Sequence, residues 1–87
     1  MQYVIELEGK DGFPTHHYQI LTRYSNGYVA APTWNAKVPM GTSYLAPATK
    51  EGVKEVLSTA IHYPNYVLSP SRVQSAMPLS LVLADFP

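Results

Sequence analysis

The sequence predicts a small α+β domain in which one amphipathic helix packs on one face of a mainly antiparallel sheet of about four or five strands. Three observations predict this class. Runs of alternating apolar and polar residues indicate strands, Asp-Gly and Asn-Gly pairs between the first runs indicate hairpins, and one stretch has helical spacing. The 87 residues suit a single domain over 1–87, in the order βββ, long loop, α, β, β.

The first two strands are predicted from alternation with a period of two. Within residues 2–8, three large apolar side chains share one face, as in a half-buried strand. Residues 9–12 contain Asp-Gly, which supplies the positive φ angles that tight turns need. A second alternating strand then follows over residues 15–24.

A hairpin is predicted at residues 26–27, because Asn-Gly is the strongest two-residue turn signal in the sequence. A two-residue turn would pair Arg23 with Ala30 and begin a third strand over 28–34. This strand contains a proline, which cannot donate a hydrogen bond to a neighbouring strand. We therefore expect the third strand at an edge of the sheet.

The middle of the chain predicts a long loop followed by the helix. Residues 35–48 contain two prolines and a glycine that break any periodicity between them, and loops of this length often carry function or hide an extra strand, here at 42–45. The helix is predicted over 49–61 with Thr49 as its N-cap, because apolar residues recur there at helical spacing.

The C-terminal third predicts two further strands and a short helix. Residues 66–69 form a short apolar run typical of a strand, and Ser69 followed by Pro70 has the pattern of a helix start. Residues 79–84 alternate leucine with small or apolar residues, so we expect a central strand there that is covered on both faces.

Composition excludes several classes of function. Six Lys and Arg balance six Asp and Glu, and the chain has no Cys. The absence of Cys excludes disulfides, thiolate zinc sites and cysteine nucleophiles. The few basic residues argue against a strongly basic nucleic-acid binder, because phosphate affinity grows with the number of Lys and Arg contacts. No basic leader and no membrane-length apolar run is present, so we expect a cytoplasmic protein without membrane contact.

No motif predicts an enzyme, a cofactor or a metal site. The sequence contains neither Gly-x-Ser-x-Gly nor a Gly-rich phosphate loop. His16 and His17 are neighbours on a predicted strand, so their side chains point to opposite faces and do not readily share one ion. The spacing does not predict a site from one of them with His62. We therefore expect no catalytic residues, no cofactor and no metal.

The aromatic content predicts protein binding instead. Interface centres are enriched in Tyr, Trp, Met and Arg and poor in charge. The chain has seven Tyr, one Trp and three Met, and we expect several of them on the sheet face that the helix leaves uncovered. The predicted partner-binding residues are Tyr18, Arg23, Tyr24, Tyr28, Trp34, Met40 and Tyr44.

In this profile the chain resembles the small, Cys-free, motif-poor proteins that phages and mobile elements encode to bind and block a host protein. The resemblance implies a non-catalytic inhibitor that acts sterically, in the host cytoplasm if it is phage-encoded. Two alternatives stay open: single-stranded nucleic-acid binding through the aromatic hairpin beside Arg23 and Lys37, and a self-assembling structural subunit. Because small domains often need added stability, we also expect a homo-oligomer, with a dimer favoured.

Overall fold

The computed structural model describes residues 1–7, 17–33 and 44–87. The predicted turn at 9–12 and most of the predicted loop at 35–48 lie outside these residues. In chain order, the elements are β1 (Gln2–Leu7), β2 (His17–Arg23), β3 (Tyr28–Ala30), β4 (Ala46–Pro47), α1 (Lys50–Thr59), β5 (Tyr63–Pro64), α2 (Pro70–Gln74), β6 (Met77–Pro78) and α3 (Leu79–Leu83).

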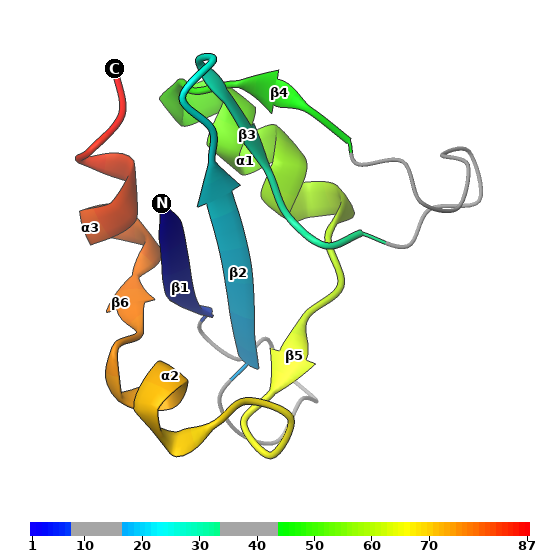
Figure 1. Cartoon of the computed structure of the whole chain (residues 1–87), viewed down its shortest axis with the longest axis vertical. Helices are drawn as coiled ribbons and strands as arrows, with labels where there is room; N and C mark the ends of the chain where they lie inside the picture. Colours follow the sequence, from blue (N-terminus) through cyan, green and yellow to red (C-terminus); the bar gives the residue numbers. More distant parts are fainter. Residues whose placement is uncertain (8–16, 34–43) are drawn as a thin grey trace.

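The strands form one mixed sheet, shown in Figure 1. Its order is β4-β3-β2-β1-β6, and β5 pairs with β2 beside this path. All pairs are antiparallel except β1 with β6, which is parallel. A sheet of several strands with a few helices is an α+β domain, so the predicted class is confirmed.

The long β1–β2 ladder decides which side chains are buried. Tyr3 lies opposite Leu21 and Ile5 lies opposite Gln19, and all four side chains are buried. Because residues directly opposite each other share a face, these four point to the same side of the sheet. We call this side the core face and the other side the outer face.

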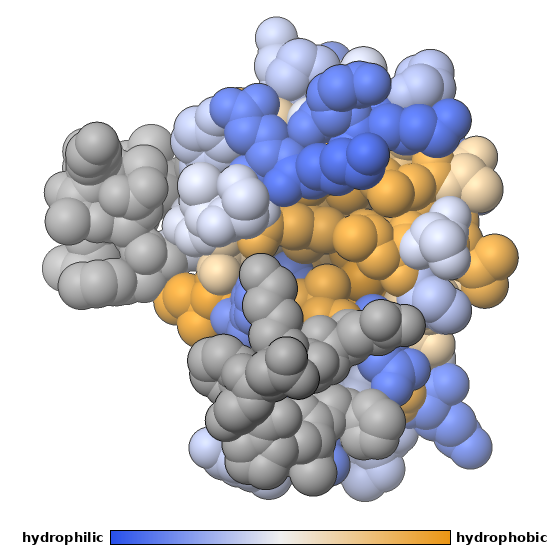
Figure 2. Space-filling model, turned by 180° about the vertical axis from the view of Figure 1, so that it is seen from behind, coloured by the Kyte–Doolittle hydropathy of each residue, from blue (hydrophilic) through white to orange (hydrophobic). Residues whose placement is uncertain are grey.

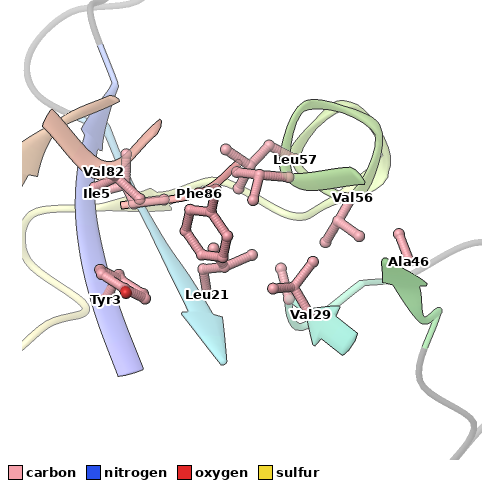
Figure 3. Packing of buried hydrophobic residues seen from close by; sticks show 11 residues of the cluster. Tyr3, Ile5, Leu21, Val29, Ala46, Val56, Leu57, Val82 and Phe86 are labelled. Atoms are coloured by element: carbon pink, nitrogen blue, oxygen red, sulfur yellow. The ribbon is translucent and has the colours of Figure 1, made fainter. Parts of the chain in front are cut away.

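One apolar cluster lies between the core face, α1 and the C-terminal segment. In Figure 3, the Phe86 ring lies in the middle of this cluster, and its centroid is 5.6 Å from that of Tyr3. The cluster comprises Tyr3, Ile5, Leu21, Val29, Ala31, Ala46, Val53, Val56, Leu57, Val82 and Phe86. Both α1 and α3 therefore cover the same face of the sheet.

The β2–β3 hairpin differs by one residue from the predicted register. Arg23 pairs with Val29 rather than with the following residue. The Tyr24 N–H donates to the Tyr28 carbonyl at 2.8 Å, so the loop has three residues and ends on Gly27 at a φ of +89°. Glycine commonly ends such loops. The observed register keeps Val29 on the core face, whereas a one-residue slip would turn it outward.

The third strand is not at an edge, contrary to the sequence prediction. β4 lies beside β3, with Ala46 opposite Val29. Pro32 follows the end of β3, so it does not interrupt the ladder. β4 is the extra strand expected near the long loop, but it begins just after the expected range 42–45, whose first two residues lie outside the described part of the chain.

The strand predicted at 66–69 is wrong. Residues 65–67 form a turn, and the short strand in this region is β5, which ends at Pro64. The helix start predicted after it is confirmed, because α2 begins at Pro70 with Ser69 as its N-cap residue.

The central strand predicted at 79–84 is also wrong, because this segment forms α3. Leu79, Val82, Leu83 and Phe86 recur at helical spacing, and all four lie in or against the core. Leu81, which shares the alternating pattern with its neighbours, is 58% exposed. The alternation of leucine therefore indicated the wrong period, and burial follows the helical one.

α1 begins as predicted. The Thr49 side chain accepts a hydrogen bond from the Gly52 N–H at 3.1 Å, which is the bond of an N-cap. Position 52 requires glycine, because a Cβ there would lie 1.9 Å from the Pro47 carbonyl oxygen. Glycine thus allows the chain at β4 to approach α1 closely.

Two short strands share the far edge of β2, and a buried glutamine lies between them. β3 pairs with one end of β2 and β5 with the other. The Gln19 side chain is fully buried, donates to the Ile61 carbonyl and accepts from the Ile20 N–H at 2.9 Å. The Ile61 N–H in turn donates to the Pro32 carbonyl at 3.3 Å. These bonds attach the segment after α1 to β2 and to the segment after β3.

We predict that Gly52→Ala destabilises the fold by about 1–3 kcal/mol, the usual cost of overpacking. The sign is diagnostic, because Gly→Ala inside a helix ordinarily stabilises by about 1 kcal/mol. Urea denaturation measures the change, and Ser58→Ala on the exposed side of α1 is the matched control, expected to stay within about 0.5 kcal/mol. A more stable Gly52→Ala variant would contradict the close approach of β4 to α1.

Candidate interaction surfaces

The structure places the predicted partner-binding residues in different surroundings. Trp34 and Met40 lie outside the described residues. Tyr18 is only 4% exposed, so its ring offers almost no surface to a partner. The other four divide between the tip of the hairpin, the contact with the C-terminal segment, and the side of α1.

Tyr24 and Tyr28 lie together at the end of the β2–β3 hairpin. Their side chains are 41% and 43% exposed, and a backbone hydrogen bond joins the two residues. Tyr28 lies opposite Pro47, which is also exposed. By the register of the sheet these residues belong to the outer face, away from α1 and α3. We call Tyr24, Tyr28 and Pro47 the hairpin-tip surface.

Arg23 contacts the C-terminal segment. Its guanidinium carbon lies 4.6 Å from the centroid of the Phe86 ring, a cation–π contact, and its Nη1 donates to the Asp85 carbonyl at 3.2 Å. The Lys50 N–H donates to the Pro87 carbonyl at 2.9 Å, which holds the same segment at α1. Arg23 therefore ties the end of the described chain to β2.

Tyr44 packs against the core from the side of α1. Its hydroxyl donates a hydrogen bond to the Glu55 carboxylate. This hydrogen bond is the main cause that raises the pKa of Tyr44 above its ordinary value, and the negative charge of Glu55 acts in the same direction. The interaction joins the chain before β4 to the exposed side of α1.

A further apolar surface lies on the helix side of the sheet. Figure 2 shows it as a continuous apolar region across the middle of that side, below the polar side chains at the top. The apolar residues that are partly exposed and packed against the core are Leu7, Tyr44, Ala48, Ala60, Met77, Leu79 and Leu83. Tyr44 is described above and Ala48 lies between β4 and α1; we call the other five residues the core-margin surface.

Two more exposed apolar residues lie on segments that also carry residues of the core-margin surface. Ile61, which follows α1, is 42% exposed, and Leu81 on α3 is 58% exposed. Sequence reasoning did not predict this surface, because a strand at 79–84 buried on both faces would have hidden its leucines. The signal that could have found it was the helical spacing from Leu79 to Phe86 directly after Pro78.

The charges on the solvent side of α1 balance. Lys50 and Lys54 are exposed together with Glu51 and Glu55. Because this helix carries two charges of each sign there, it does not favour a partner of either charge. Contact beside it would rest on burial of apolar area, which depends only weakly on salt.

A third exposed group lies at the turn between β5 and α2. Tyr66 and Val67 are 85% and 54% exposed. A shallow, open hollow lies beside this turn, lined by Asn65, Leu68, Pro70, Val73 and Gln74. The hollow is too open to enclose a small molecule.

Comparisons with models of protein families, with curated proteins and with solved structures found no match to this chain. None of the helices in the described part of the chain is long and apolar enough to cross a bilayer. Within residues 1–7, 17–33 and 44–87, no three or more His, Asp or Glu side chains gather as a metal site would require. The candidate surfaces therefore rest on sequence and geometry alone.

We predict that Glu55→Gln lowers the pKa of Tyr44 toward the ordinary tyrosine value of about 10, because the negative acceptor is lost. The bond's contribution to stability is present at neutral pH and is lost as the pH rises above about 10. NMR titration of the tyrosine rings measures the change, with Tyr44→Phe to assign the signal. Glu51→Gln, also exposed on α1, is the matched control. A Tyr44 pKa that is equal in Glu55→Gln and wild type would contradict the assignment.

Proposed function

We propose that this chain binds another protein through the core-margin surface and acts by covering part of that partner. The observation that carries the proposal is the continuous apolar region in Figure 2. Soluble proteins that stay monomeric rarely expose large contiguous apolar patches, and such patches commonly mark interaction sites. A non-catalytic, steric role agrees with the composition, which is rich in aromatic residues and poor in charge.

The core-margin surface is built on packed elements. Leu79 and Leu83 belong to α3, whose Val82 is fully buried beneath them. Ala60 follows α1, where Leu57 is 7% exposed. A surface supported by a packed core loses little conformational entropy when a partner covers it, which favours binding.

The hairpin-tip surface is a second place for contact. Tyrosine is enriched among the residues that dominate binding energy at interfaces. Tyr24 and Tyr28 lie on the outer face, however, so a flat partner on the helix side would not reach them. The two surfaces therefore make separate predictions, and one experiment can distinguish them.

The nucleic-acid alternative has less support from the described residues. Stacking of bases needs exposed rings beside cations that can reach the phosphates. Tyr18 is almost fully buried, and the Arg23 guanidinium already lies over Phe86. The self-assembling alternative would use the same core-margin surface, with a second copy of the chain as the partner.

A photo-crosslinking amino acid at Leu81 tests the proposal in cells that naturally express the chain. We expect one discrete adduct to a different protein, because Leu81 is exposed on α3, the helix that also carries Leu79 and Leu83 of the core-margin surface. Val67 is the matched control, since its exposure of 54% is close to the 58% of Leu81 and it lies at the turn before α2. The adduct should form equally at low and high salt, because apolar contacts are not screened.

Other outcomes of this experiment overturn the proposal in distinct ways. An adduct of the chain with itself would replace it by self-assembly. A discrete adduct from Tyr28 and none from Leu81 would move the interface to the hairpin tip. The same adducts from Leu81 and Val67, or none from either, would remove the core-margin surface as a binding site.

A further inference from the structure

We propose that His17 and His62 form a two-histidine site for a late first-row divalent cation, with Zn²⁺ as the representative ion. Their ring centroids lie 6.4 Å apart, and the ring planes are tilted by 59°. These are two of only three histidines in the chain. The fold thus brings together residues that are far apart in the sequence.

The backbone holds the two histidines in place. His17 begins β2 and lies opposite Pro64 in the ladder with β5. On the other side of His62, the Ile61 carbonyl accepts the hydrogen bond from the buried Gln19 side chain. Both neighbours of His62 are therefore attached to β2, so the approach of the rings follows from the fold itself.

The chemistry of the pair suits zinc. Imidazole nitrogens bind Zn²⁺ at about 2.0–2.1 Å, so two rings on one tetrahedral ion must lie somewhat closer together than the 6.4 Å seen here. His62 is exposed, and rotation of its side chain can bring its ring nearer to the partly buried His17. Since the chain has no Cys, imidazole is the ligand it offers that best suits zinc.

Water would complete the coordination, because the described residues contribute no third side chain to a metal group. Two protein ligands give a weaker site than the four of a structural zinc centre. Binding should be reversible, and it should clamp the segment after α1 onto β2. The sequence spacing could not distinguish His16 from His17 as the partner of His62. The structure places His17 beside His62, and His16 lies outside the described residues.

Thermal unfolding of the tag-free chain with and without Zn²⁺ at neutral pH tests this site. We expect saturating Zn²⁺ to raise the Tm by roughly 4–8 °C, and Mg²⁺ to leave it unchanged. His17→Ala and His62→Ala should each abolish the rise. His16→Ala is the matched control and should keep it. Zn²⁺ should also shift the imidazole NMR signals of His17 and His62 together.

Each variant is compared with its own Tm in EDTA, so a loss of stability from the substitution is not counted as a loss of binding. Absence of a shift in the wild-type chain would overturn the site. A shift that survives in His62→Ala, or disappears in His16→Ala, would also overturn it. The experiment needs no protein partner, so its result is independent of the proposed binding function.

Discussion

The hydrogen bonds of the buried Gln19 side chain hold the edge of β2 on which the rest of the structure depends. β1 pairs with β2 along its whole length, but two separate short strands share its other edge. Between them, no strand of the described part of the chain pairs with β2, and buried backbone groups need partners. Gln19 supplies one from its side chain, because it donates to the Ile61 carbonyl and accepts from the Ile20 N–H.

The position of α1 follows from this attachment and from one at the other end of the helix. At the start of α1, Gly52 lets the chain at Pro47 approach closely. At its end, Gln19 holds Ile61 and the Thr33 hydroxyl donates to the Thr59 carbonyl at 3.0 Å. With α1 held at both ends, its apolar side meets the C-terminal segment over the core face. Both the core-margin surface and the approach of His62 to His17 depend on this arrangement.

Local patterns in the sequence predicted those parts of the fold that local physics decides. The alternation that buries Tyr3 and Ile5, and the capping by Thr49, depend on neighbours along the chain. The predicted hairpin register was wrong because Asn-Gly also suits a three-residue loop. The observed register is the one that places Val29 on the core face. The strand predicted at 79–84 was wrong because leucines at alternate positions obscured the helical period of Leu79, Val82, Leu83 and Phe86.

The candidate site was predictable to a smaller extent. Exposure of Tyr24 and Tyr28 agrees with their predicted place on the face away from the helix. The use of Arg23 to hold Phe86 could not be predicted, because the two residues are far apart in the sequence and only folding brings them together. The same holds for the core-margin surface, which gathers residues from four segments of the chain.

Hydrogen exchange of Gln19→Met tests most directly whether the hydrogen bonds of the Gln19 side chain hold the edge of β2. Methionine keeps a similar volume and removes both hydrogen bonds of the side chain. We expect a loss of about 1–3 kcal/mol in the free energy of unfolding and faster exchange of the Ile61 amide, which bonds to Pro32. Unchanged stability with an equally protected Ile61 amide would contradict the account.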